Sequence, residues 1–276
     1  MSPETMAAPE LRLLRQNLHL SYTQIQTYLG CSLRYLFQYV QGLPPEHVGA
    51  SLILGSAVHQ ALARYYLALR NTGKPPEREV LLESFRLDLI ARIDREQKPI
   101  LYKSEASDAE ALLGQGTGLL EAFLEDPGFS GMEVLAVELP LSTPLTVGND
   151  IALVGVIDLL LKDGLGHLVA IDHKTAKNAF TQEAADQDLQ FSAYTLLLSD
   201  NGYLKPGQIL TCGFNLLRKL KSPKVERRLT MRTPADQERF SRLAQAVLLA
   251  IEREVFLPCQ GWQCSDCPYA SACADW

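Results

Sequence analysis

The stretch VGVIDLLLKDGLGHLVAIDHKTAK (residues 154–177) contains two aliphatic runs separated by charged residues and glycines. Aliphatic and β-branched residues favour strands, and the glycines between them favour a tight turn, so the stretch predicts a β-hairpin. Each run carries one acid with apolar neighbours on both sides, Asp158 in the first and Asp172 in the second. Burying a carboxylate is costly unless a cation compensates its charge. The two acids are therefore candidate ligands for a cation.

The register of the hairpin decides whether the two acids meet. If residues 164–166 form a three-residue loop, Asp158 lies directly opposite Asp172, with Cβ atoms roughly 4.5–5.5 Å apart. The carboxylates would then repel unless a metal or a proton lay between them. Lys174 shares this face, and its cross-strand neighbour Val156 cannot pair with its charge. A loop longer by one residue would put the acids on opposite faces; the structural alternative is a pair of edge-strand acids beside a snorkelling lysine.

Two carboxylates beside a lysine suit the hydrolysis of phosphodiesters. Hard cations such as Mg²⁺ or Mn²⁺ prefer oxygen ligands and keep several waters. A bound cation lowers the pKa of a coordinated water and holds a phosphodiester, while a lysine orients the water or neutralises the transition state. The hairpin therefore indicates a metal-dependent hydrolase.

The rest of the chain predicts an α/β fold with a central mixed sheet flanked by helices. We expect a single domain over residues 1–276, with a helical insertion at about 71–130. Helical spacing and capping residues, with Ser21 or Thr23 opening the first helix, predict helices at 20–42, 52–69, 181–199 and 234–256. Strand composition predicts strands at 132–141, 150–161, 166–174, 208–217 and 225–231.

Composition narrows the class of protein. The chain has 276 residues, 47% of them hydrophobic, and a net charge of −6, which argues against a protein coated with positive charge. It has no run of eighteen apolar residues, and its first twenty residues resemble neither a signal nor a transit peptide. We therefore expect a cytoplasmic protein with no membrane partner, whose six cysteines are metal ligands or core residues.

A local basic segment stands out against the acidic background. Seven Lys or Arg residues but only one acid, Glu226, lie between residues 215 and 232. This segment is either a solvated strand and loop or a surface that follows phosphates.

Three cysteines near the end of the chain predict a metal or cluster site. They lie in GWQCSDCPYASACADW (residues 261–276), and such sites normally take four protein ligands. The fourth thiolate comes either from Cys259, which gives C-x4-C-x2-C-x5-C, or from the distant Cys31. Four thiolates alone do not distinguish zinc from a [4Fe-4S] cluster, and Cys212, with apolar neighbours, is expected in the core.

Several motifs in a fixed order resemble the PD-(D/E)XK nucleases of the RecB-like branch. They are GSAVH (55–59), Glu138, GVID (155–158), IDHK (171–174) and QFSAY (190–194). SYTQIQTYLGCSLRYLFQYV (21–40) and WQCSDCPYASAC (262–273) are similar to segments of the iron-sulfur-containing exonucleases of that branch. The resemblance runs from about residue 20 to the end and implies a restriction-endonuclease-like core.

The resemblance also implies roles for individual residues. His59, Asp158 and Asp172 would bind the metal together with the backbone carbonyl of His173, and Lys174 would be the catalytic lysine. Gln190 and Tyr194 would position substrate and lysine, and Glu138 would lie near the site. Cys31 would join Cys264, Cys267 and Cys273 around a [4Fe-4S] cluster, with structural zinc as the alternative. One departure is Ser32, which stands where many members have proline.

Together these features predict a Mg²⁺- or Mn²⁺-dependent deoxyribonuclease, an exonuclease acting on single-stranded DNA or DNA ends. The alternative is a non-catalytic DNA-binding or scaffold subunit of a recombination, repair or adaptation complex. Since the chain carries no helicase P-loop, a helicase or a recombination or adaptation protein is a possible partner.

Overall fold

A computed structural model describes residues 13–15, 18–103, 106–145, 151–205 and 207–276. The first twelve residues, on which most of the expectation about signal peptides rests, lie outside this part of the chain. Within it, no helix is long and apolar enough to cross a membrane.

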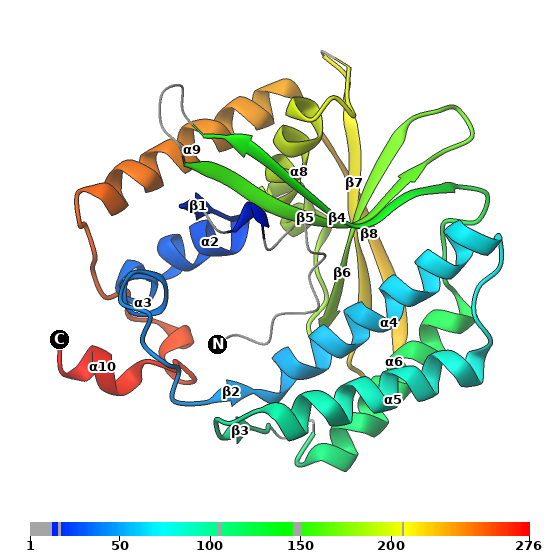
Figure 1. The fold of residues 1–276 in the computed structure, drawn as a ribbon, viewed down its shortest axis with the longest axis horizontal. Coiled ribbons are helices and arrows are strands. Elements are labelled where there is room, and N and C mark those ends of the chain that lie inside the picture. Colours follow the sequence, from blue (N-terminus) through cyan, green and yellow to red (C-terminus); the bar gives the residue numbers. More distant parts are fainter. Residues whose placement is uncertain (1–12, 16–17, 104–105, 146–150, 206) are drawn as a thin grey trace.

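The core is one mixed β-sheet (Figure 1). Its strand order is β1-β5-β6-β7-β8, and β4 also pairs with β5. β5 pairs antiparallel with both β4 and β6, whereas β6 and β7 run parallel. The predicted α/β class with a mixed central sheet is therefore confirmed. The strands are β1 (His19–Leu20), β4 (Glu133–Pro144), β5 (Ala152–Lys162), β6 (Leu168–Ala176), β7 (Leu210–Arg218) and β8 (Lys224–Arg232).

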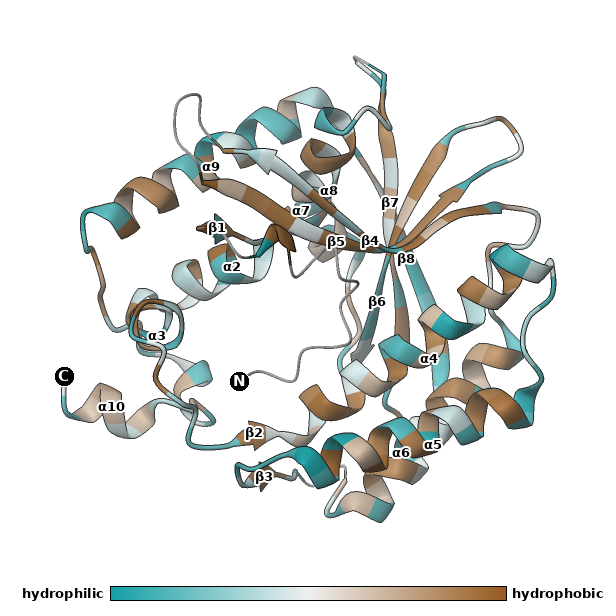
Figure 2. Ribbon diagram, in the orientation of Figure 1, coloured by the Kyte–Doolittle hydropathy of each residue, from teal (hydrophilic) through white to brown (hydrophobic). Residues whose placement is uncertain are grey.

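Helices cover both faces of this sheet and form two hydrophobic cores. On one face lie α4, α5 and α6, whose alternating brown and teal turns in Figure 2 mark them as amphipathic. On the other face lie α2, α8 and α9. The main helices are α2 (Tyr22–Gly30), α4 (Ala50–Thr72), α5 (Arg78–Arg95), α6 (Ala109–Glu125), α8 (Leu189–Asp200) and α9 (Pro234–Glu252).

Two helices, α5 and α6, occupy the segment predicted as a helical insertion. Between them β3 (Ile100–Leu101) pairs with β2 (Val48–Gly49), just before α4. Gly116 of α6 allows the close packing, because a Cβ atom there would lie 2.2 Å from the Phe85 ring. The segment therefore packs against α4 and the sheet.

Two predicted helices are interrupted in the structure. The helix expected at 20–42 ends at Gly30, because Cys31 is extended, and continues as α3 (Ser32–Tyr35) and a π-helix (Leu36–Val40). Ser21 does open α2, through a capping box with Gln24.

The helix expected at 181–199 is also broken. It divides into α7 (Gln182–Gln187) and α8 at Asp188, whose side chain accepts a hydrogen bond from the backbone N–H of Gln190. Asp188 therefore begins a new helix, with Gln190 in its first turn.

Most arginines of the basic segment are used inside the fold. Arg218 pairs with Glu226 at 2.8 Å, and Arg227 pairs with Asp126 at 2.8 Å. Arg228 donates to Glu226, and the buried Arg232 donates to the backbone carbonyl of Asp188. The reading of this segment as a surface that follows phosphates is thus weakened, because these guanidinium groups hold strands and helices together.

Candidate active site

The hairpin has the predicted register. Leu159 pairs with Ile171 and Leu160 with Ala170, so the paired numbers add up to 330, and the turn is closed by Asp163 N–H donating to His167 O at 2.9 Å. The regular pairing stops one step before the two acids. There the carboxylate of Asp158 accepts a hydrogen bond from the backbone N–H of His173 at 2.9 Å. The pairing between β5 and β6 therefore ends just before Asp158 and Asp172.

A third acid, Glu138 on β4, forms a row with Asp158 and Asp172, here called the acid row. Its neighbours pair with the neighbours of Asp158, Val137 with Leu159 and Leu139 with Ile157. Glu138 itself has a left-handed backbone, with φ of 50°, which is strained for a residue with a Cβ atom. Three adjacent strands thus each contribute one acid at the same level.

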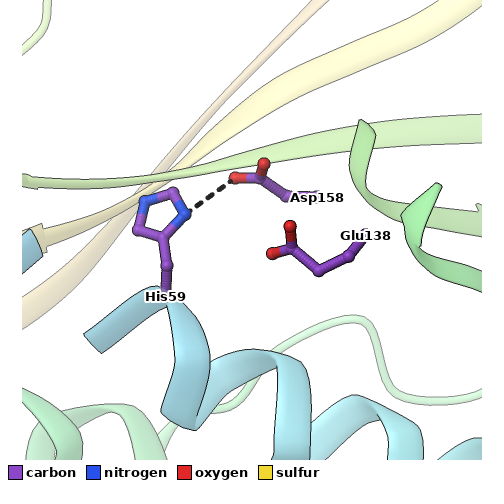
Figure 3. A group of neighbouring side chains, drawn as sticks. All are labelled: His59, Glu138 and Asp158. Atoms are coloured by element: carbon purple, nitrogen blue, oxygen red, sulfur yellow. Dashed lines mark ion pairs between the residues drawn. The ribbon is translucent and has the colours of Figure 1, made fainter. Parts of the chain in front are cut away.

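A helical histidine joins two of these acids (Figure 3). Nδ1 of His59 on α4 lies 3.3 Å from Oδ2 of Asp158. His59, Glu138 and Asp158 each offer one ligand atom, and the three atoms lie within 4.8 Å of one another. Helix α4 runs close to β6 here, since a Cβ atom at Gly55 would lie 3.5 Å from the Thr175 hydroxyl, in ordinary van der Waals contact.

The remaining predicted residues surround Asp172. Lys174 Nζ lies 2.9 Å from Asp172 Oδ2 and donates to Gln190 Oε1 at 3.1 Å. Gln190 Nε2 and the Tyr194 hydroxyl both donate to Asp172 Oδ1, the latter at 3.2 Å. Gln190 and Tyr194 are one helical turn apart on α8 and therefore face the same side.

Helix α8 packs tightly against the hairpin because of one glycine. A Cβ atom at Gly155, in the GVID motif, would lie 2.6 Å from Leu197 of α8. A larger residue would require the end of the Leu197 side chain to shift.

The group of potential ligands differs from the predicted one. The resemblance implies His59, Asp158 and Asp172, whereas the compact group contains Glu138 in place of Asp172. Asp172 is 2% exposed and is held by Lys174, Gln190 and Tyr194. The two acids remain electrostatic neighbours, since Asp172 raises the pKa of Asp158.

A family model shows to which superfamily the chain belongs. The model of the PD-(D/E)XK nuclease superfamily matches residues 19–274. The chain belongs to this superfamily. No sequence among the curated proteins matches it.

One solved structure supports the fold of this PD-(D/E)XK chain. A candidate exonuclease from Eubacterium rectale has 13% sequence identity and a TM-score of 0.51, over 91% of this chain and 87% of that one. The structure of SSO0001 has 15% identity and a TM-score of 0.34, over 92% and 95% of the two chains, and this TM-score is too low to support an argument. At 13% identity the first structure supports the fold alone.

Burial and mutual repulsion raise the pKa of two acids of this PD-(D/E)XK site, Glu138 and Asp158. Burial, followed by the charges of Asp158 and Asp172, raises the pKa of Glu138 to about 8. Burial and Asp172 raise the pKa of Asp158 to about 6, although His59 opposes the shift. For Lys174, burial lowers the pKa, but Asp172 and Asp158 outweigh it and the net shift is upward. The lysine therefore stays charged while Glu138 retains a proton near neutral pH.

The raised pKa of Glu138 predicts how metal-free stability depends on pH. Its stabilising effect is complete below the unfolded pKa and is lost as the pH rises through about 8. The pKa of His173 is lowered, so it is already neutral in this range. Between pH 7 and 9 we expect the unfolding temperature in EDTA to fall by roughly 3 °C. Glu138→Gln should remove the fall; an equal fall in this variant, measured by calorimetry, would assign it to another group.

The resemblance implies a role for the backbone carbonyl of His173 but none for its ring. The ring is buried and stacked on Tyr66, with centroids 5.7 Å apart, and its Nδ1 lies 3.2 Å from Asn215 Nδ2. Because its backbone N–H donates to Asp158, this packing fixes a partner of the acid row. The predicted contribution of the His173 carbonyl to a metal remains a prediction.

A second contact missed from the sequence joins the N-terminal motif to α8. The Tyr22 hydroxyl donates to Asp188 Oδ1 at 3.0 Å and accepts a hydrogen bond from Gln26 at 2.7 Å. Asp188 Oδ1 also accepts from the backbone N–H of Gln190. A signal existed in the sequence, since Asp188 is a good N-cap two residues before Gln190.

The two ends of the chain meet around the cysteines. Ser32 exchanges hydrogen bonds with the backbone of Leu257, and Cys31 Sγ accepts one from the backbone N–H of Cys259 at 3.4 Å. Leu33, Phe37 and Tyr269 form a small core, against which Cys31 and Cys267 pack. Burial, then Cys31, Cys267 and Cys264, raises the pKa of Cys273. These four thiols are therefore neighbours, and all six cysteines are unpaired.

Proposed function

We propose that this protein is a metal-dependent DNA nuclease that hydrolyses phosphodiesters in single strands or at ends. The observation that carries the proposal is the row of three acids on β4, β5 and β6, with His59 on one side and the Asp172–Lys174 ion pair on the other. Membership of the PD-(D/E)XK superfamily supports the same activity.

The donor set suits a hard divalent cation. Glu138 and Asp158 supply carboxylate oxygens and His59 an imidazole, which together fit Mg²⁺ or Mn²⁺. Burial and then mutual repulsion raise the pKa of Glu138 and Asp158, and a cation in place of the protons would relieve the repulsion. We assign Asp172 to the edge of this site, as the residue that links the ligands to the lysine.

Lys174, Gln190 and Tyr194 have separate roles beside the cation. When bound, the cation would supply Lewis acidity toward the phosphodiester and lower the pKa of a coordinated water. Lys174 keeps its proton and places a fixed positive charge beside the acid row, where negative charge builds up on the phosphate. Gln190 and Tyr194 fix Asp172 and thereby the direction of the ammonium group.

The four neighbouring thiols form the basis of a second proposal. We assign Cys31, Cys264, Cys267 and Cys273 to a [4Fe-4S] cluster that joins the two chain ends. A tetrahedral zinc site would hold its sulfurs about 3.8 Å apart, given Zn–S bonds of about 2.3 Å. In the described part of the chain, the one group of potential ligands within 4.8 Å contains no cysteine. The choice of a cluster over zinc follows the resemblance to the iron-sulfur-containing exonucleases, and the iron and zinc content of the protein tests it.

The activity is tested by digesting end-labelled single-stranded and double-stranded DNA with Mg²⁺ or Mn²⁺. We expect a ladder of products from the single strand, none in EDTA, and a loss of labelled ends that reveals polarity. A chain that binds DNA in a salt-sensitive manner but cuts no substrate would instead be the non-catalytic subunit.

Tyr22→Phe is expected to lower kcat roughly tenfold and leave KM nearly unchanged, because it removes the hydroxyl that holds Asp188 at the start of α8. Tyr28→Phe is the matched control. Its hydroxyl, on the same helix, donates to Val255 O at 2.6 Å, outside the site. Equal losses of kcat in both variants would show that α2 acts only through stability.

A further inference from the structure

A cavity of about 1240 Å³ lies beside α4, separate from the acid row. Four parts of the chain form its wall: one side of α4, the second half of α5, the loop at 42–49, and the cysteine-bearing segments through Arg34, Gln38 and Tyr269. None of the proposed metal ligands lines it. The cavity therefore needs an explanation of its own.

The cavity is positively charged, although the chain as a whole is negative. Six basic side chains line it, against the three acids Asp88, Glu96 and Asp266; the six are Arg34, Arg64, Arg92, Arg95, Lys98 and Lys103. Two of the acids are already paired, Asp88 with Arg92 at 2.7 Å and Asp266 with Lys103 at 2.5 Å. An excess of positive charge in a concave surface attracts a polyanion.

Three of the basic side chains have charged or hydrogen-bonding groups without a partner among the described residues. The charged groups of Arg95 and Lys98 have no partner among the residues that the structure describes. The Nε atom of Arg34 is buried and has no hydrogen-bond partner there. Arg95 is exposed and Lys98 half-buried, so both can reach a phosphate.

Apolar side chains share the cavity with these charges. Leu52 is 58% exposed and Leu43 is 36% exposed, and Pro44 and Pro45 stand beside them. A double helix would offer this surface mainly phosphates and sugars. A single strand offers phosphates together with the faces of unstacked bases, which bind apolar surface.

The cavity adjoins the metal ligands along α4. Gln60, which lines the cavity, directly follows His59, so their side chains differ by about 100° around the helix. Leu52, Ser56 and Gln60 are four residues apart and form one ridge on the outer side of α4. A strand lying along this ridge would pass next to His59.

We infer that this cavity is the binding site for single-stranded DNA, which it delivers along α4 to the acid row. Arg95 and Lys98 bind phosphates, and Leu43 and Leu52 contact bases. The inference rests on the proposed nuclease function. It also implies that the cysteine-bearing segments form one wall of the DNA-binding site.

The test measures binding without cleavage, by fluorescence anisotropy of a labelled oligothymidylate in EDTA. Arg95→Ala combined with Lys98→Ala should weaken binding roughly tenfold and reduce the slope of log affinity against log salt by about 1.4, since each lost phosphate contact on a single strand contributes about 0.7. Leu52→Ser should weaken binding without changing this slope, because it removes no charge.

Arg70→Ala combined with Lys74→Ala is the matched control, with one arginine and one lysine exposed at the far end of α4. It should leave affinity unchanged. Equal weakening by both double variants, or a duplex bound as tightly as the single strand, overturns the inference. If the parent cleaves DNA but the Arg95 and Lys98 substitutions do not affect binding, the assignment of the cavity is wrong and the proposed nuclease function stands. If these substitutions weaken binding but the parent cleaves no DNA, the proposed nuclease function is wrong and the assignment of the cavity stands.

Discussion

Replacing Lys174 with alanine is expected to lower the rate of DNA cleavage roughly a thousandfold, because the variant loses the fixed charge beside the acid row. Asp172→Ala should have an effect of similar size, since the lysine then loses its partner at 2.9 Å. The measurement is the initial rate on a labelled single strand at saturating Mg²⁺ or Mn²⁺. KM should change little compared with kcat.

Lys162→Ala is the control for Lys174→Ala. Lys162 lies at the far end of β5 and pairs with Glu133 at 2.5 Å on the surface, so its loss should leave the rate unchanged. Thermal unfolding of all variants separates chemistry from folding. If Lys174→Ala and Asp172→Ala fold and still cut as fast as the parent, the assignment of the active site is wrong.

Replacing Cys31 with serine is expected to remove the iron of the anaerobically purified protein and to lower its unfolding temperature by roughly 10 °C, because a group bound only by the folded state stabilises that state. Cys264→Ser, Cys267→Ser and Cys273→Ser should behave alike. Iron content, visible colour and calorimetry measure the outcome.

Two other cysteines provide controls for this experiment. Cys212 is fully buried in β7, far from the other thiols in sequence, and Cys259 is exposed beside Cys31. Cys212→Ser changes the core without touching the site, and Cys259→Ser tests the alternative fourth ligand. We expect both to retain iron. Loss of iron in Cys259→Ser but not in Cys31→Ser would show that Cys259, and not Cys31, is the fourth ligand. A colourless parent protein that holds one zinc per chain would contradict the assignment of a cluster.

The chemistry of the hairpin could be predicted from the sequence because local rules determine it. The glycines of the loop favour a tight turn, and a three-residue loop gives the register in which Leu159 pairs with Ile171. The approach of Asp158 to Asp172 and the placement of Lys174 follow from that register. The grouping of Cys31 with the C-terminal thiols around a cluster is implied by the resemblance and remains a prediction.

Other features depend on contacts between distant parts of the chain. The left-handed backbone of Glu138 has no signal in its sequence neighbours, and Glu138 lies with Asp158 and His59 in the compact group. One partner of the arginine-rich segment lies far away in the sequence, since Asp126 precedes Arg227 by 101 residues. The break at Asp188 follows from its own side chain, which caps Gln190, whereas at Cys31 the extended backbone accompanies a contact with the distant Cys259.

The hydrogen bonds of Ser32 affect how the protein would be assembled. Its hydroxyl holds Leu257 through both the N–H and the carbonyl, and Tyr269 packs against Leu33 and Phe37, so contacts that involve no thiol also hold the C-terminal tail. Proline at this position could not make either bond. If the four thiols bind a cluster, we expect these contacts to keep the tail beside Cys31 when it is removed, so that its loss and reinsertion are reversible without unfolding of the nuclease core.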